Sequence, residues 1–309
     1  MKVLHDIKDF NPSKPVWLTQ GTFDGVHIGH QKILKQVISE AKNAGGLSVL
    51  LTFYPHPRLV LYPDNNELKL LTTIEEKAKF VGDLGLDYLI IMPFTKELSR
   101  LKSEEFVRDI LVEKLKVSKL IIGYDHRFGR NREGGIKEMQ LYAEAFGFNL
   151  EEISAQDIEQ SIVSSTKIRN SLLNGNVEIA ASYLGRSYCV NGTVEKGMQR
   201  GRTIGFPTAN IRVNSSFKLV PKNGVYAVWV RLGKNKYAGM LNIGDNPTFE
   251  NKNWSIEVYI FDFAEDIYGL EISVEFIKKS RGEIKFEGIK ELTEQLKEDE
   301  KRIREILEV

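Results

Sequence analysis

Residues 16–30 read Val-Trp-Leu-Thr-Gln-Gly-Thr-Phe-Asp-Gly-Val-His-Ile-Gly-His, and they decide the fold of the first half of the chain. Residues 16–18 form a short apolar run, which is typical of a buried strand. Beyond the glycine-rich segment, the apolar residues of 31–44 recur at helical spacing, and Gly45 and Gly46 end that helix. A strand, a glycine-rich turn and a helix in this order predict the first unit of a parallel α/β sheet.

The same alternation continues to about residue 153. Strands are predicted at 47–53, 86–92, 120–122 and 148–153, and helices at 74–84, 103–115 and 137–146. Thr72 and Thr73 are candidate caps for the helix at 74–84. Continuous apolar strands indicate a parallel sheet whose two faces are both covered by helices. We therefore expect a Rossmann-like α/β domain with an open parallel sheet.

The pattern changes after about Gly185. Strands that are rich in β-formers and often alternating are predicted at 188–194, 225–232, 237–243, 256–263 and 272–277, and a helix at 288–307. Strands in such close succession indicate a small antiparallel β-barrel or sandwich. Helices at 166–173 and 177–184 are expected to bridge the two halves. The expected domains are residues 1–185 and residues 186–309, the second ending in the C-terminal helix.

Composition limits the class of protein. The 309 residues include 43 Lys plus Arg and 42 Asp plus Glu, and a net charge of +1 argues against a nucleic-acid partner. The single cysteine, Cys189, excludes a disulfide framework within the chain and any CxxC site. No apolar run approaches the roughly 18 residues of a membrane helix, and the first residues meet charge too early for a signal peptide. We expect a cytoplasmic protein with no membrane partner, either a monomer or a weak oligomer.

The chemistry of the first half centres on residues 21–30. In an open parallel sheet, ligands bind beyond the carboxyl ends of the strands, where this segment lies. Its glycines let the backbone approach a ligand, and the helix N-terminus offers free N–H groups to phosphate. His27 and His30 can lie on one side of the first helical turn and donate hydrogen bonds to a triphosphate and its leaving pyrophosphate. The alternatives are two surface histidines in a turn, or a zinc site, for which no third ligand stands at a recognisable spacing.

Residues 21–30 resemble the HxGH signature of the nucleotidyltransferase superfamily, and the variant with Phe-Asp-Gly is similar to bacterial bifunctional riboflavin kinase/FAD synthetases. Further family motifs are matched by 52–57 (Thr-Phe-Tyr-Pro-His-Pro), 123–129 (Gly-Tyr-Asp-His-Arg-Phe-Gly) and 164–169 (Ser-Ser-Thr-Lys-Ile-Arg). The chain departs from the family pattern at Thr22, where asparagine is usual, and at His126, where phenylalanine is usual. The resemblance implies a domain that lets the phosphate of FMN attack ATP, giving FAD and pyrophosphate.

The resemblance also implies which residues act in this domain. Catalysis falls to His27 and His30, ATP binding to Gly21, Phe23, Asp24, Gly29, Ser165, Thr166 and Arg169, and FMN binding to His56, Asp125 and Arg130. Arg169, one turn after the start of its helix, could hold a phosphate by a charge-assisted fork. Several of these residues have a plainer alternative. Ser165 or Thr166 can be a helix cap, Asp125 a turn former, His56 part of a stiff exposed turn, and Arg127, Arg130 and Arg132 a solvated basic loop.

The second half carries no P-loop, because Gly-x-x-x-x-Gly-Lys-Ser/Thr does not occur in the sequence. It has instead a glycine-rich stretch at 197–205, which suits a flap over phosphates and includes the cations Arg200 and Arg202. An ordinary loop between strands is the alternative. Thr208 and Asn210 stand two residues apart, so they share one side of an extended chain, and their oxygens suit Mg²⁺.

Residues 205–210 (Gly-Phe-Pro-Thr-Ala-Asn) closely resemble the hallmark of the riboflavin kinase barrel, and 224–226 and 242–249 match two more of its segments. That family uses a glutamate as general base on the ribityl 5′-hydroxyl, a role the resemblance assigns to Glu257. Without it, Glu257 is a solvent-facing strand residue, and Arg281 and Phe286 belong to a plain strand–helix connection. The resemblance further implies ATP binding by Gly197, Arg202, Gly205, Phe206, Pro207 and Asn210, flavin binding by Arg281 and Phe286, and Mg²⁺ on Thr208 and Asn210.

Motifs in both halves therefore favour one bifunctional enzyme, which phosphorylates riboflavin to FMN and adenylylates FMN to FAD, with ATP as co-substrate and Mg²⁺ as cofactor. Two alternatives stay open. The first domain could act on another acceptor or be inactive, or the chain could be a non-catalytic flavin-binding protein. A pure binder needs neither a base nor metal ligands, so Glu257 and the Pro-Thr-Ala-Asn tetrad speak against the second alternative.

Overall fold

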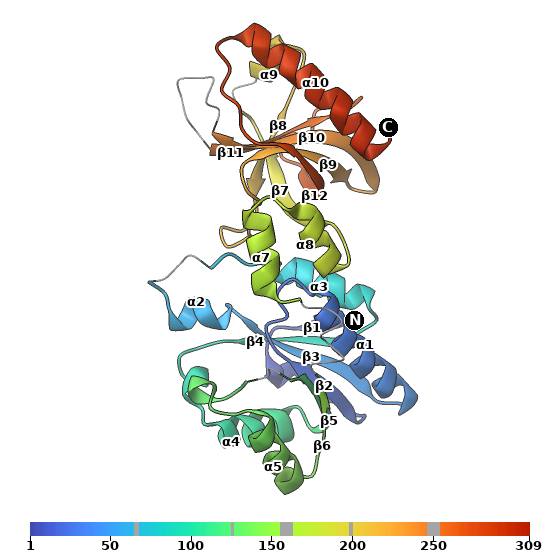
Figure 1. The fold of residues 1–309 in the computed structure, drawn as a ribbon. Helices are drawn as coiled ribbons and strands as arrows, with labels where there is room; N and C mark the ends of the chain where they lie inside the picture. The colour runs from blue at the N-terminus through green and yellow to red at the C-terminus, as the bar shows by residue number, and fades with distance from the viewer. Residues whose placement is uncertain (65–67, 125–126, 155–162, 198–199, 246–253) are drawn as a thin grey trace. The chain divides into compact units, whose positions relative to one another are not determined.

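The computed structural model describes residues 1–64, 68–124, 127–154, 163–197, 200–245 and 254–309 (Figure 1). The chain divides into two compact units, Met1–Ser165 and Thr166–Val309. Each unit has its own sheet, and the two are described one after the other. None of the helices in the described part of the chain combines the length and the apolar character needed to span a bilayer.

The first unit contains a six-stranded sheet in the order β1-β4-β3-β2-β5-β6, in which every pair of neighbouring strands is parallel. The strands are β1 (Lys2–Leu4), β2 (Val16–Gln20), β3 (Leu47–Tyr54), β4 (Tyr88–Pro93), β5 (Val117–Gly123) and β6 (Asn149–Ile153). The open parallel sheet is confirmed, and the predicted strands correspond to β2–β6. Strand β1 was not predicted, because a three-residue edge strand is too short to show a period.

Helices cover both faces of this sheet, as Figure 1 shows for α1 and α3 on one side and α4 and α5 on the other. They are α1 (Ile28–Asn43), α3 (Ile74–Asp83), α4 (Ser103–Glu105), which continues as the π-helical segment η3 (Phe106–Lys114), and α5 (Ile136–Phe146); shorter helices are η1 (Ile7–Asp9), α2 (Pro57–Leu61), η2 (Leu98–Arg100) and η4 (Arg130–Arg132). Thr73 caps α3, since its hydroxyl accepts the N–H of Glu76 while the carboxylate of Glu76 accepts the N–H of Thr73.

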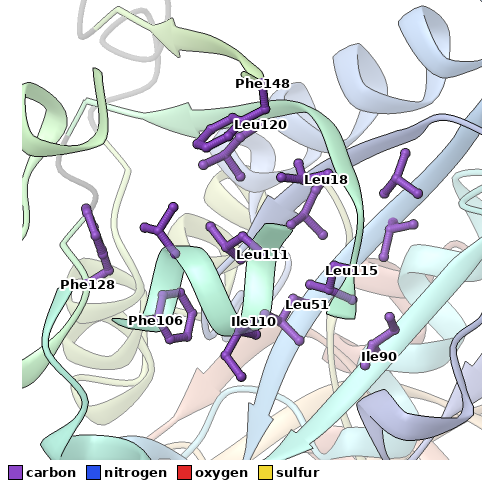
Figure 2. Close-up of a cluster of buried hydrophobic side chains, with 14 of the residues drawn as sticks. Leu18, Leu51, Ile90, Phe106, Ile110, Leu111, Leu115, Leu120, Phe128 and Phe148 are labelled. Atoms are coloured by element: carbon purple, nitrogen blue, oxygen red, sulfur yellow. The ribbon is translucent and has the colours of Figure 1, made fainter. Parts of the chain in front are cut away.

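Successive residues of the strands point to opposite faces of the sheet and belong to two hydrophobic clusters, one on each face. Leu18, Leu51 and Leu120 pack against Phe106 and Leu111 (Figure 2). On the opposite face, Leu50, Leu89 and Ile121 pack against Leu34 of α1 and Val81 of α3. Strands β3, β4 and β5 contribute to both clusters, and burial on two sides accounts for the continuous apolar runs in their sequences.

The second unit begins with two helices, α7 (Ser165–Leu173) and α8 (Val177–Leu184). The first residue of α7, Ser165, is also the last residue of the first unit. Six antiparallel strands then form a closed barrel in the order β10-β11-β8-β7-β12-β9. They are β7 (Tyr188–Glu195), β8 (Ala209–Val213), β9 (Gly224–Leu232), β10 (Asn235–Asp245), β11 (Trp254–Ile260) and β12 (Glu271–Arg281), and a short helix α9 spans Arg200–Thr203. The structure resolves the expectation of a barrel or sandwich in favour of the barrel. Strand β8, which was not predicted, closes it by pairing with β7 and β11.

The C-terminal helix α10 (Ile289–Leu307) covers one outer face of the barrel. Its Ile303 and Leu307 pack with Phe206, Val225 and Met240. The predicted helix at 288–307 is confirmed, and its apolar residues meet the barrel because they recur on one face of the helix.

We predict that Leu111→Ala lowers the free energy of unfolding of the first unit by about 2–5 kcal/mol, because it leaves a cavity beneath the sheet. Leu111 is completely buried. Leu141→Ala is the matched control, since Leu141 of α5 is 64% exposed. Hydrogen exchange of β2, β3 and β5 in a denaturant series measures the difference within this unit, and equal protection in both variants would contradict the prediction.

Candidate active sites

The segment 21–30 lies where strand β2 ends and helix α1 begins, at the carboxyl end of a strand flanked by β3 and β5. His27 precedes α1 as its cap, and its Nδ1 accepts the backbone N–H of His30 at 3.3 Å. The two imidazole rings are stacked with centroids 3.6 Å apart. The prediction that both histidines share one side of the first turn is confirmed.

His30 is held as a neutral imidazole. Burial, followed by the neighbouring His27 and Lys77, lowers the pKa of His30 well below its ordinary value. Its ring also lies 4.6 Å from that of Phe23, and its buried Nδ1 has no hydrogen-bond partner within the described residues. His30 can therefore offer a hydrogen bond to a ligand, but at neutral pH it offers no charge.

Two backbone N–H groups of the loop have no acceptor within the described part of the chain. Phe23 (φ +44°) and Val26 (φ +41°) adopt the left-handed conformation that few such residues occupy. Across the described ranges, no acceptor lies within hydrogen-bond distance of the N–H of Thr22 or Phe23. Successive unpaired N–H groups followed by the N-terminus of a helix are a typical anion-binding arrangement.

Asp24 anchors this loop from within. Its buried carboxylate accepts the N–H of Leu71 at 3.0 Å and of Thr72 at 3.1 Å, and the hydroxyl of Thr72 at 3.3 Å. Its carbonyl accepts the hydroxyl of Ser165 at 2.9 Å. These contacts give Asp24 and Ser165 a role in holding the loop. Gly21 allows a close approach within the loop, because a Cβ there would come within 3.2 Å of the ring of Phe23. Gly29 is buried in the first turn of α1.

Lys77 was not foreseen from the sequence. It projects from α3, is 7% exposed, and donates from Nζ to the carbonyl of Thr22 at 2.6 Å and to the hydroxyl of Thr52 at 3.2 Å. Burial lowers its pKa to about 8, and the charge of Asp24 opposes that shift. No local signal could have found it, because a lysine within a helix is most simply a surface residue.

The other predicted residues of the first half lie in several places. Thr166 and Arg169 follow Ser165 on α7 and belong to the second compact unit. His56 caps α2, with its Nδ1 accepting the N–H of Arg58. Arg130 is exposed and begins η4, where its N–H donates to the carbonyl of Leu101. Asp125, like His126, lies outside the described residues.

Glu257 is the centre of the candidate site in the barrel. Its carboxylate accepts the hydroxyl of Thr208 at 3.0 Å and the hydroxyl of Ser255 at 2.9 Å. In the strand register, Glu257 of β11 lies directly opposite Asn210 of β8 on one side and Asn242 of β10 on the other. Directly opposed residues share a face of a sheet, so a row of polar residues crosses three strands here. Only the register reveals that Asn242 belongs to this row.

The glycine-rich stretch is shaped by close backbone approaches. A Cβ on Gly197 would overlap the side-chain amide of Asn210, and one on Gly201 would overlap the carbonyl of Phe206. Gly205 has φ +83° and ends the turn, after which Phe206 is buried edge-on against Tyr259, with ring centroids 5.2 Å apart. Arg202 and Pro207 are exposed.

Arg281, the last residue of β12, forms an ion pair with Asp299. Its guanidinium binds both carboxylate oxygens of Asp299 on α10, at 2.6–3.0 Å, and Asp299 is 3% exposed. The guanidinium lies 5.9 Å from the ring centroid of Phe286. The structure thus gives Arg281 a structural role, in which it ties α10 to the barrel.

Comparisons with known proteins agree with this arrangement. Residues 10–167 match the family model of FAD synthetase, and residues 184–307 match that of riboflavin kinase. A crystal structure described as a macrolide-efflux protein from Streptococcus pneumoniae is 31% identical, covers 98% of both chains and superposes with a TM-score of 0.87. The words "macrolide-efflux" describe the Streptococcus pneumoniae protein and are not applied to the present chain.

Curated relatives extend over nearly the whole chain. The bifunctional riboflavin kinase/FMN adenylyltransferase of Listeria monocytogenes is 41% identical, over 92% of this chain and 90% of its own length. The proteins of the same name from Bacillus subtilis and Escherichia coli K12 are 40% and 35% identical, over 90% and 99% of this chain and 88% and 97% of their own lengths. With both family models matched in order, the chain belongs to the family of bifunctional riboflavin kinase/FMN adenylyltransferases.

Proposed function

We propose that the two activities of this enzyme use separate sites. FMN adenylylation is assigned to the loop at 21–30 in a domain of residues 1–185, and riboflavin phosphorylation to Thr208, Asn210 and Glu257 in a domain of residues 186–309. The observation that carries the assignment is that each unit has its own cluster of polar groups suited to polyphosphate chemistry, with the stacked histidines in one and the Glu257 row in the other.

In the kinase site, Glu257 is proposed as the general base. An ionised carboxylate accepts the proton of the riboflavin 5′-hydroxyl as that oxygen attacks the γ-phosphorus of ATP and ADP leaves. Hydrogen bonds from Thr208 and Ser255 fix the orientation of the carboxylate before substrate arrives. The four lone-pair positions of a carboxylate leave room for the substrate hydroxyl beside these two donors.

The residues around Glu257 also fit Mg²⁺. Because the O–H of Thr208 donates to Glu257, the lone pairs of that oxygen stay available, and Asn210 adds an amide oxygen on the strand position opposite Glu257. Such hard oxygen ligands suit Mg²⁺, which takes its remaining ligands from water and phosphates. When bound, the ion would neutralise charge on the transferring phosphoryl group. The residues proposed to hold the ion are therefore Thr208 and Asn210.

In the adenylyltransferase site, the N–H groups of Thr22 and Phe23 and the helix N-terminus are proposed to hold the triphosphate of ATP. An oxygen of the FMN phosphate attacks the α-phosphorus, and pyrophosphate leaves, so no covalent intermediate on the protein is needed. His27 and His30 donate hydrogen bonds to the leaving group. Since His30 is neutral, it supplies no positive charge to balance the pyrophosphate.

The remaining assignments rest on family resemblance. They comprise Phe23, Asp24, Ser165, Thr166 and Arg169 for ATP and His56, Asp125 and Arg130 for FMN in the first site, and Gly197, Arg202, Gly205, Phe206 and Pro207 for ATP and Arg281 and Phe286 for flavin in the second. A cytoplasmic monomer or weak oligomer, with no nucleic-acid partner, completes the proposal. It is supported by the balanced charge of the chain and by the small substrates of both reactions.

We predict that Glu257→Gln lowers riboflavin phosphorylation by about 10²-fold or more, because an amide cannot accept the proton. FMN adenylylation by the same chain should persist. Chromatography of FMN and FAD formed from riboflavin, or from added FMN, with ATP and Mg²⁺ measures both. Glu271→Gln, at an exposed position of β12, is the matched control. Retention of the full kinase rate would falsify the base assignment.

We also predict that His30→Ala lowers FAD synthesis from FMN by about 10²-fold, through the loss of one donor to the leaving group, and leaves FMN formation unchanged. His5→Ala, at an exposed position, controls for the loss of an imidazole. The same product assay reports both reactions. Loss of both activities in a folded His30→Ala protein would indicate one shared site and contradict the separation proposed here.

A further inference from the structure

Lys77 is a buried cation that the mechanism above leaves unused. Lys77 comes from α3, far from the glycine-rich loop in sequence, yet its ammonium lies directly against that loop. We propose that Lys77 is a positioning residue of the adenylyltransferase site, which orients the Thr22–Phe23 peptide and supplies a fixed positive charge for the triphosphate. This inference rests on the proposed function of the loop at 21–30.

The first part of the proposal concerns backbone orientation. Nζ of Lys77 and Oγ1 of Thr52 both donate to the carbonyl of Thr22, at 2.6 and 3.4 Å. In a planar trans peptide, the carbonyl of Thr22 and the N–H of Phe23 point in opposite directions. Fixing the carbonyl towards Lys77 therefore turns the N–H of Phe23 away from it. That N–H is one of those left unpaired in the described part of the chain, as an anion ligand requires.

The second part concerns charge. Within the described residues, the hydrogen-bond acceptors of Lys77 are two neutral oxygens, and it makes no ion pair with a carboxylate. The nearby carboxylate of Asp24 is engaged by the N–H groups of Leu71 and Thr72. The charge of Asp24 offsets part of the cost of burying this ammonium, and a bound polyanion would relieve the rest.

The charged and titratable groups around Lys77 give the sign of its pH dependence. Burial lowers the pKa of Lys77, Asp24 opposes this shift from the loop, and the resulting pKa is about 8. His30 on α1 is neutral. Strand β3 contributes only the neutral Thr52, and on α3 itself the carboxylate of Glu76 accepts the N–H of Thr73. Lys77 is therefore charged below about pH 8 and loses its charge as the pH rises, and bound ATP would shift that loss to higher pH.

This titration separates charge from hydrogen bonding. A neutral lysine amine keeps two N–H donors, enough for both hydrogen bonds that Lys77 makes. If the lysine only holds the loop, FAD synthesis passes through pH 8 without a Lys77-dependent change. If its charge binds triphosphate, kcat/KM for ATP falls by about tenfold per pH unit above pH 8, whereas kcat falls only at higher pH.

The test is the pH profile of FAD synthesis from FMN in the full chain, for wild type and Lys77→Met. We expect Lys77→Met to lower kcat/KM for ATP by about 10²-fold at pH 7 and to abolish the fall above pH 8. Lys79→Met is the matched control, because Lys79 is an exposed lysine on the same helix, paired with Asp83. Riboflavin phosphorylation by the same chain reports whether the variant is otherwise intact.

Three results would overturn the inference. They are an unchanged kcat/KM in Lys77→Met, a fall above pH 8 that persists in that variant, or a wild-type profile without the fall. The last applies even if Lys77→Met fails to fold. His30→Ala, measured in parallel, separates the role of Lys77 from the assignment of FMN adenylylation to the loop at 21–30. If His30→Ala impairs FAD synthesis and Lys77→Met does not, only the role of Lys77 is wrong, whereas full activity in His30→Ala removes the site assignment itself.

Discussion

The carboxylate of Asp24 accepts two backbone N–H groups, from Leu71 and Thr72, and the glycine-rich loop depends on this contact. Among the described residues, the N–H groups of Thr22 and Phe23 have no acceptor, and Phe23 and Val26 adopt an uncommon conformation. Both features disfavour the loop in isolation. A buried carboxylate with several donors offsets part of that cost. Lys77, Thr52 and Ser165 hold the carbonyls of Thr22 and Asp24 in turn. The loop is therefore shaped before any ligand arrives.

The barrel prepares its site by a different route. There, strand pairing itself sets Asn210, Glu257 and Asn242 in one row, and two hydroxyl donors hold the carboxylate of Glu257. Regular strand pairing supports this site. In the first unit an irregular loop carries the chemistry, and side chains from β3, α3 and α7 must hold it.

The electrostatics of the two histidines explain why further cations are needed. Burial, followed by the neighbouring His27 and Lys77, lowers the pKa of His30, so His30 contributes a hydrogen bond without a charge. A leaving pyrophosphate nevertheless develops charge that water alone stabilises poorly in a partly buried site. A lysine held against the loop can meet that need, because its hydrogen-bond acceptors among the described residues are two neutral oxygens.

The sequence by itself determined the alternation of strands and helices in the first unit, the turn to antiparallel strands after Gly185, and the position of the His27–His30 segment at the end of a strand. These features are local, since they depend on the period of apolar residues and on glycines and caps within a few positions. The motif residues Thr208 and Glu257 were also singled out, although their hydrogen bond spans 49 positions. Only the tertiary structure decided that β8 closes the barrel, that Asn242 lies opposite Glu257, and that the carboxylate of Asp24 accepts the backbone N–H groups of Leu71 and Thr72. It also brought Lys77 to Thr22, 55 positions away, and Arg281 to Asp299. The physical reason is that contacts between distant segments follow from packing and strand register, which leave no periodic trace in either segment.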